Sequence, residues 1–344
     1  MKSIKNILVT GGLGYIGSHT VVALQQAGYR VVIIDDLSNT QISVLDNIAK
    51  ITNVKPGFYS IDLKNREAVD RFFNDHKIDG IIHFAAYKAV GESVEKPLMY
   101  YRNNLLGLIN VLEAMEKHQV DHFIFSSSCT VYGQADQMPI HEQTPLKRPE
   151  SPYGKTKYMG EEIISDFVST SLKNAIVLRY FNPVGAHMSG LIGEVPNGIP
   201  NNLIPYITQT AAGIRESLGV FGNDYETRDG TAIRDYIDVN DLAGAHVKAL
   251  NRLLNKENKN NLEYFNLGSG TGSTVLEMVQ AFEKANNLKI PYEIKDRRAG
   301  DIQEAYADYS LVKKELNWMP HTPLETSMKT AWEFECKQVN KLKR

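Results

Sequence analysis

The feature that most constrains the fold of this chain is the alternation, through its first half, of short continuous apolar runs with amphipathic stretches. Five of the runs have the composition of buried β-strands, and GFYSID is a weaker sixth: NILVT, RVVIID, GIIHFAA, HFIFSSS and AIVLRYF. Such strands belong to parallel sheets that are covered on both faces. Helical patterns lie between them, as in 65–77 and 98–119. Because parallel strands are joined by right-handed crossover helices, the sequence predicts an α/β fold with a doubly wound, Rossmann-type parallel sheet.

The pattern loosens after the fifth strand. Residues 182–202 are rich in Gly, Pro and Asn, which marks a long loop or a domain border. Two later pieces, RDYIDV and LEYFNLGSG, are again strand-like, so we expect return segments around 234–268. We therefore predict a first domain over 1–182 with those return segments, and a smaller mixed α/β domain over 183–344.

A glycine-rich turn follows the first strand. TGGLGYIGSHT places Gly11, Gly14 and Gly17 between that strand and a helix. Glycine lets the backbone pass close to a pyrophosphate, which the free N–H groups of the helix then bind. Asp35 and Asp36 end the second strand, where an acid accepts hydrogen bonds from an adenosine ribose and repels a 2′-phosphate. The pattern predicts bound NAD rather than NADP; a glycine-rich surface turn is the alternative.

A serine cluster and a Tyr-x-x-x-Lys pair suggest a reactive site. Ser126, Ser127 and Ser128 end one strand, and ligands of open α/β sheets bind outside the carboxyl ends of strands. A serine-rich turn is the alternative. SPYGKTK then places Tyr153 and Lys157 one helical turn apart. They are either solvated residues in weak contact or an acid–base catalyst and the cation that lowers its pKa.

Context and electrostatics favour the catalytic interpretation. Tyr309 and Lys313 repeat the spacing, but no strand end precedes them. A free tyrosine has a pKa near 10, so a tyrosinate at neutral pH needs stabilisation by roughly 4 kcal/mol. One positive charge about 6 Å away, at an effective dielectric of about 20, supplies roughly 2.8 kcal/mol. Lys157 together with the positive nicotinamide of oxidised NAD is sufficient.

The bulk composition excludes some partners. Lys+Arg 38 against Asp+Glu 40 leaves a net charge of −2, which argues against nucleic acid or an anionic membrane as a partner. The chain has 2 cysteines without a metal-ligand spacing, and no secretory signal or membrane span is visible. We expect a cytoplasmic protein without a metal site.

Several motifs together resemble one family. The chain is similar to the UDP-glucose 4-epimerases, extended members of the short-chain dehydrogenase/reductase superfamily, through the glycine turn, SPYGKTK, and HFAAYKAVGESV, SSSCTVYG, RYFNPVGAH, GIPNNLIPY, FGNDY, GTAIRDYIDV and RRAGD. Single motifs occur in many sugar-nucleotide enzymes, whereas the ensemble is specific and covers nearly the whole chain. The resemblance implies NAD-dependent, reversible epimerisation of UDP-galactose and UDP-glucose at C4 through a 4-keto sugar.

The resemblance also implies the residues of the site. Tyr153 is the base, Ser128 its partner, and Lys157 binds the nicotinamide ribose. The implied cofactor-binding residues are Gly11, Gly14, Tyr15, Ile16, Gly17, Asp35, Asp62, Leu63, Phe84, Ala85, Lys88, Asn103, Ser126, Tyr153, Lys157 and Tyr180. The implied substrate-binding residues are Lys88, Ser128, Tyr153, Asn182, Asn202, Leu203, Phe221, Arg234, Tyr236, Arg298, Asp301 and Ala305. Taken alone, Asp62 is equally an N-cap, and each arginine a surface ion pair.

Substrate range and alternatives follow from single positions. Ala305 stands where some members carry a tyrosine beside the sugar's 2-substituent, so we hypothesise that N-acetylated UDP-hexoses also fit unless Tyr306 fills the space. A 4,6-dehydratase of this fold has an Asp-Glu pair where this chain has Cys129 and Thr130. A decarboxylase acting on UDP-glucuronate is disfavoured, because nothing in the resemblance suggests residues that bind the carboxylate of that substrate. A non-enzymatic NAD sensor is a further alternative, but such a protein has no need for the tyrosine, the lysine and the serine together.

The resemblance implies a homodimer through helices around 95–119 and 152–171.

Overall fold

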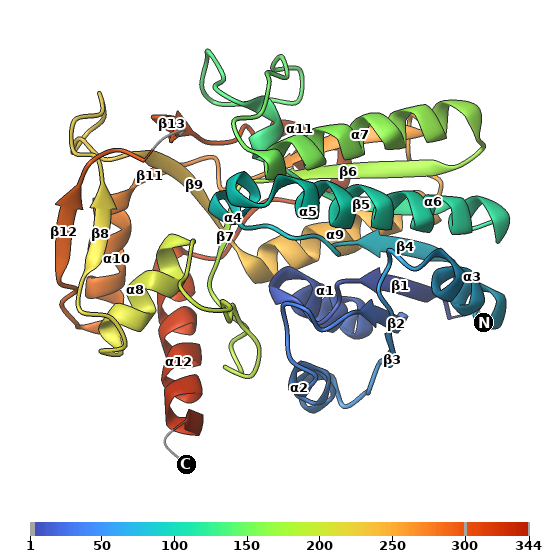
Figure 1. Ribbon diagram of the computed structural model, residues 1–344, viewed down its shortest axis with the longest axis horizontal. Helices are drawn as coiled ribbons and strands as arrows, with labels where there is room; N and C mark the ends of the chain where they lie inside the picture. Colours follow the sequence, from blue (N-terminus) through green and yellow to red (C-terminus); the bar gives the residue numbers. More distant parts are fainter. Residues whose placement is uncertain (1–3, 299–300, 343–344) are drawn as a thin grey trace.

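The computed structural model of the chain describes residues 4–298 and 301–342. Its larger sheet has seven parallel strands in the order β10-β6-β5-β4-β1-β2-β3 (Figure 1). Their bounds are β1 (Asn6–Thr10), β2 (Arg30–Asp35), β3 (Gly57–Ser60), β4 (Gly80–His83), β5 (His122–Ser128), β6 (Asn174–Tyr180) and β10 (Leu262–Leu267). The predicted parallel sheet and α/β class are confirmed, and the order reverses between β1 and β4, where such sheets bind ligands.

Helices cover both faces of this sheet. One face is covered by α1 (Tyr15–Gln26), α2 (Ser43–Thr52), α9 (Val239–Leu254) and α11 (Ser310–Leu316). The other face is covered by α3 (Arg66–Asp75), α6 (Gly107–Lys117) and α7 (Pro152–Thr170). Each helix buries an apolar stripe on Val-, Ile- and Leu-rich strands, which is why the strands read as continuous apolar runs.

The remaining elements form a second, smaller part. Its strands are β7 (Asn182–Val184), β8 (Leu218–Phe221), β9 (Ile233–Asp238), β11 (Gly272–Thr274), β12 (Tyr292–Lys295) and β13 (Glu304–Ala305). Its helices are α8 (Leu203–Ala211), α10 (Val275–Asn286) and α12 (Leu324–Leu342), which share an apolar core with β7 and β8. β9 pairs with β7, β11 and β13, and β8 pairs with β12.

The two strand-like return segments have different positions. LEYFNL is β10 and lies at the edge of the larger sheet, whereas RDYIDV forms most of β9 and lies in the smaller one. The connection between them is α9, which packs on α1 and on the larger sheet (Figure 1). The chain therefore returns to the first sheet after β9, and the limits 1–182 and 183–344 stay predictions.

The stretch 98–119 is not the single helix that its pattern predicts. Following α4 (Val90–Glu95), it consists of α5 (Pro97–Tyr101), a π-helical segment (Arg102–Leu106) and α6. Within that segment Asn104 bonds the backbone of Tyr87 in both directions, at 2.8 and 3.0 Å, and the hydroxyl of Thr156 at 3.0 Å. These bonds hold Asn104 inward, and wide turns of this kind are frequent at functional sites. No helix among the described residues is long and apolar enough to span a bilayer.

Candidate active site

The glycine turn is built so tightly that two of its positions exclude a side chain. Gly11 has φ +68°, and a Cβ added there would lie 2.7 Å from the Ala85 nitrogen. A Cβ on Gly17 would lie 2.2 Å from the Gly11 carbonyl oxygen. Gly14 is the N-cap of α1 and has no side chain to accept from the first N–H groups of the helix. The turn thus offers free N–H groups on an open backbone surface, as a pyrophosphate requires.

Asp35, and not Asp36, belongs to this turn. Its buried carboxylate accepts from the backbone nitrogens of Leu13 at 3.1 Å and Leu37 at 3.0 Å. Burial raises the pKa of Asp35, and these two N–H groups oppose that shift. Asp36 instead turns outward and caps Ser38. The first acid is therefore the one placed beside the glycine turn, at the end of β2.

Two of the predicted cofactor-binding residues are linked by a lysine that sequence reasoning missed. Lys64 forms an ion pair with Asp62 at 2.9 Å and bonds the side-chain oxygen of Asn103 at 2.8 Å. The carbonyl of Leu63 accepts from Asn110 at 2.7 Å. The loop after β3 and the π-helical segment thus form one wall of the site.

Some predicted cofactor residues have partly buried side chains that pack against the core. The side chain of Ile16 packs into the core beneath α1, and the Phe84 ring lies 4.7 Å from the ring of His246. The Phe84 nitrogen donates to the Thr10 carbonyl at 3.0 Å, at the end of β1. Ala85 lies against Gly11. The end of β4 therefore supports the glycine turn from the neighbouring strand.

Tyr153 stands at the start of α7, where Ser151 caps the helix by accepting from the Gly154 nitrogen at 3.1 Å. The tyrosine is buried, and burial is the main reason that its pKa is raised well above the usual range. The neighbouring Tyr180 raises the pKa further, whereas a hydrogen bond with the Ser128 hydroxyl lowers it. Tyr153 and Ser128 therefore lie together, and the phenolate form needs positive charge nearby.

Lys157 lies one turn further along the same helix. Its ammonium donates to the Ser126 carbonyl at 2.6 Å and lies 5.0 Å from the centroid of the Phe125 ring. Burial lowers the pKa of Lys157 to about 8, and the carboxylate of Glu161 opposes this shift. The Ser126 hydroxyl is bonded to that of Tyr180 at 2.5 Å. Residues from β5, β6 and α7 thus form one buried cluster.

The predicted substrate residues of the second part form another cluster. Asp301 pairs with Arg298 at 3.0 Å and with Arg234 at 3.5 Å. The Arg298 guanidinium lies 4.7 Å from the centroid of the Phe221 ring. Burial raises the pKa of Tyr236 to about 12, although both arginines act to lower it. Two guanidinium groups, whose planar forks match phosphate oxygens, thus lie beside one carboxylate and two aromatic rings.

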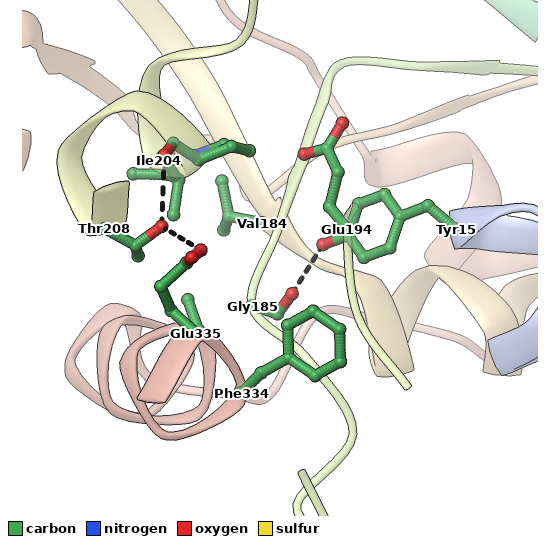
Figure 2. A pocket seen from close by; sticks show the side chains of 10 residues that line it. Tyr15, Val184, Gly185, Glu194, Ile204, Thr208, Phe334 and Glu335 are labelled. Carbon is green, nitrogen blue, oxygen red and sulfur yellow. Dashed lines mark hydrogen bonds between the residues drawn. The ribbon is translucent and has the colours of Figure 1, made fainter. Parts of the chain in front are cut away.

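The first and second parts are joined at a carboxylate that sequence reasoning also missed. Glu194 accepts from Lys88 at 2.6 Å and from Asn202, the N-cap of α8 before Leu203, at 2.7 Å. Figure 2 shows Glu194 beside the Tyr15 ring, whose hydroxyl donates to the Gly185 carbonyl at 2.7 Å. The Lys88 ammonium lies 5.7 Å from the centroid of that ring. Glu194 therefore holds two predicted ligand-binding side chains.

Two further substrate residues lie on strands of the smaller sheet. Asn182 stands opposite Tyr236 in the register of β7 and β9, and Ala305 stands opposite Arg234 in that of β13 and β9. Ala305 is buried in an apolar cluster, and the ring of the next residue, Tyr306, lies beside Gly272. The other members of the cluster are Val131, Tyr132, Ile140, Phe181 and Ala307, with Cys129 packed against it.

The chain is similar over almost its whole length to proteins of known activity. A family model described as GDP-mannose 4,6 dehydratase matches residues 8–331. A UDP-glucose 4-epimerase of Bacillus subtilis is 51% identical over 97% of this chain and 98% of its own length.

Solved structures agree with that likeness. The UDP-glucose 4-epimerase of Stenotrophomonas maltophila, with bound NAD and formylated UDP-arabinopyranose, has a TM-score of 0.95 and 44% identity, covering 98% of this chain and 99% of that one. The enzyme of Bifidobacterium longum, in complex with NAD+ and UDP, has a TM-score of 0.93 and 43% identity, with the same coverage of 98% and 99%.

Proposed function

This chain belongs to the UDP-glucose 4-epimerase family, and we infer that it interconverts UDP-galactose and UDP-glucose by NAD-dependent inversion at C4. The observation that carries this function is the buried cluster of Tyr153, Ser128 and Lys157 at the carboxyl end of β5. β5 belongs to the same parallel sheet as β1, and β1 is followed by the glycine turn, whose open backbone suits a dinucleotide pyrophosphate.

A dehydratase reaction, which the matching family model names, fits this site less well. Elimination of the C6 hydroxyl needs an acid and a base in addition to the tyrosine. The positions after Ser128 hold Cys129 and Thr130. Burial raises the pKa of Cys129 to about 12, so its thiol is a poor proton donor or acceptor at neutral pH. Epimerisation needs no such pair.

The side chains of the cluster divide the proton chemistry between them. NAD, when bound, supplies the acceptor and donor of hydride for C4 of the sugar. Tyr153 takes the proton of the C4 hydroxyl and returns it after the 4-keto sugar has turned over. Ser128 shares the same oxygen, and Lys157, whose pKa is about 8, is protonated at neutral pH and favours the phenolate.

The cluster in the second part is suited to holding the nucleotide. We propose that Arg234 and Arg298 bind the diphosphate, because planar guanidinium groups match phosphate oxygens in pairs. Asp301, which both arginines contact, is then free to accept from a ribose hydroxyl. Phe221 offers an apolar surface beside Arg298, and Asn182 and Asn202 complete the sugar-binding side.

The function is tested by conversion of UDP-galactose to UDP-glucose with purified protein and no added NAD. Conversion without addition shows an epimerase that retains its cofactor. Conversion only after addition shows the same activity with weakly bound NAD. If neither plain nor N-acetylated UDP-hexoses are converted after NAD has been supplied, the proposed function is wrong.

We propose that the small side chain of Ala305 admits N-acetylated sugars. Ala305→Tyr should lower kcat/KM for UDP-N-acetylglucosamine by roughly 100-fold, because the ring takes the space of the acetamide group, and should leave UDP-galactose within a few-fold of the original value. Competition between the paired substrates measures this ratio. Ala305→Ser is the control and should preserve both activities. Equal loss of both activities would contradict the proposal.

We also propose that the chain forms a homodimer through α5, the π-helical segment, α6 and α7. These elements pack together and expose apolar side chains: Leu98 at 80%, Leu106 at 40%, Ile109 at 38% and Met159 at 42%. Exposed apolar side chains gathered on packed helices are typical of an interface.

Sedimentation equilibrium tests the dimer. The unaltered protein should have twice the chain mass of 38.6 kDa. Ile109→Asp combined with Met159→Asp should give monomers, because each carboxylate would be buried without a partner. Val54→Asp, at an exposed apolar residue outside the patch, is the control and should leave the mass unchanged. A double variant that sediments as a dimer places the interface elsewhere.

A further inference from the structure

A buried ion pair lies directly behind the catalytic cluster. Glu161 on α7 is 2% exposed and Arg179 on β6 is 4% exposed. Arg179 donates from Nη2 to Oε2 at 2.5 Å and from Nε to Oε1 and Oε2 at 3.0 and 3.2 Å. The Ser127 hydroxyl donates to the same carboxylate at 2.5 Å. Burying two charges is costly, so a pair of this kind needs a reason beyond stability.

The position of Glu161 in the sequence places it in register with the catalytic residues. Tyr153, Lys157 and Glu161 are spaced by four, so they lie on one face of α7 in successive turns. Their partners on β5 are also consecutive. Lys157 bonds the carbonyl of Ser126, Glu161 bonds Ser127, and Tyr153 meets Ser128. Glu161 therefore fastens the helix to the strand at the residue between the two that serve the catalytic groups.

The other side of the ion pair is equally fixed. Arg179 donates to the Tyr132 hydroxyl at 3.0 Å, and that hydroxyl donates to Asn266 on β10 at 2.7 Å. The guanidinium also lies 5.0 Å from the centroid of the Tyr132 ring and 4.6 Å from that of the Tyr264 ring. A satisfied polar network that joins a helix to three neighbouring strands leaves Glu161 little freedom to move.

We propose that Glu161 is a positioning residue for the reaction: through Ser127 and Arg179 it holds the end of β5 against α7, and its carboxylate sustains the positive charge of Lys157. This inference rests on the proposed epimerase function. It assigns to Glu161 no contact with substrate or cofactor.

The groups that surround Lys157 show why the carboxylate matters. The titratable groups that act on Lys157 itself are Glu161 on α7 and His83 on β4. The groups that act on Tyr153, one turn earlier, are Tyr180 on β6, Cys129 after β5 and Tyr100 on α5, and Arg179 on β6 pairs with Glu161. Glu161 is the carboxylate among them, and it raises the pKa of Lys157, which burial lowers to about 8. Without that anion, and with Arg179 left unpaired, the ammonium loses its proton at a lower pH.

Glu161→Gln tests the charge while keeping the shape. Activity that depends on protonated Lys157 falls as pH rises through its pKa, so the alkaline limb of the kcat profile should move to lower pH by about one unit. At pH 8.5 kcat should fall by roughly 10-fold relative to the unaltered protein, with KM changed less than 3-fold. Glu161→Asp keeps the charge and should leave the limb in place even where kcat is reduced.

A matched pair elsewhere in the chain separates this effect from general loss of packing. Arg252 and Glu263 form another buried ion pair, at 2.6 Å between α9 and β10, and Arg252 also pairs with Glu315 at 3.1 Å. Glu263→Gln should lower the thermal midpoint, by less than Glu161→Gln because Glu315 remains, and should not move the pH profile. If Glu161→Gln does not fold, the double variant Glu161→Met with Arg179→Met removes both charges of the pair. The alkaline limb of its kcat profile should still lie at lower pH than that of the unaltered protein.

The outcomes are distinguishable. The role of Glu161 is wrong if the alkaline limb of the pH profile does not move in a folded variant that lacks the Glu161 charge, or if Glu263→Gln moves it equally. In both cases the unaltered protein still converts UDP-galactose. Absence of conversion by the unaltered protein overturns the proposed function instead.

Discussion

Tyr153→Phe should lower kcat for the conversion of UDP-galactose by about 1,000-fold, within the range that general acid–base catalysis contributes. The substitution removes one hydroxyl and keeps the ring, so the buried start of α7 stays packed. Ser128 cannot replace the lost base, because a serine hydroxyl does not ionise at neutral pH. Coupled assay of UDP-glucose formation gives the rate.

The chain provides its own control for this prediction. Tyr309 and Lys313 have the same spacing as Tyr153 and Lys157, but Tyr309 is the N-cap residue of α11, which covers the opposite face of the sheet from α7. Tyr309→Phe should leave kcat within about 2-fold, because the ring that packs against the core is kept and the removed hydroxyl lies outside the Tyr153 cluster. Bound NAD should be retained in both variants, as measured by absorbance after denaturation. A Tyr153→Phe protein with more than a tenth of the original rate would show that another group is the base.

The parts of the site that the sequence predicts are those encoded by local pattern. Apolar runs of strand length, a glycine turn after the first of them and a tyrosine–lysine pair each express a short-range requirement of the backbone or of one helical turn. Asp35 could be chosen at the end of its strand for the same reason. These features lie together in the structure because parallel strands end at one edge of the sheet.

The residues that were missed act through partners far along the chain. Glu194 meets Lys88 across 106 positions, and Lys64 meets Asn103 across 39. The residues around Glu194 in the sequence do not distinguish it from an ordinary solvent-exposed glutamate. The signal available for Glu161 was its spacing of four from Lys157, which acquires meaning only once Arg179 is known to lie behind it.

The π-helical segment shows the same limit. The apolar spacing of 98–119 is that of one amphipathic helix, and the wide turn follows from the bonds of Asn104 to Tyr87 and Thr156. Tertiary contacts therefore decide where the helix departs from its local preference. For β9, pairing with β7 and β11 decides which sheet the strand enters.

Gly17→Ala should remove most of the bound NAD, by roughly 10-fold or more, and should lower the free energy of unfolding by about 1–3 kcal/mol through overpacking. The added Cβ would lie 2.2 Å from the Gly11 oxygen and 3.0 Å from the Gly12 Cα. Those atoms cannot retreat easily, because Gly11 is itself in close contact with the backbone of Ala85. The turn must open, and the N–H groups of α1 then lose their aim at the pyrophosphate.

Gly244→Ala is the matched control, since Gly244 lies inside α9 and a Cβ there meets nothing within 4 Å. Alanine is favoured over glycine in a helix by about 1 kcal/mol, so this variant should unfold at the same or a higher temperature and keep its NAD. Cofactor content after gel filtration and the thermal midpoint distinguish the two. A Gly17→Ala protein that carries NAD at the original stoichiometry would mean that the cofactor is held mainly by its contacts beyond the turn, at Asp35, Lys88 and Lys157.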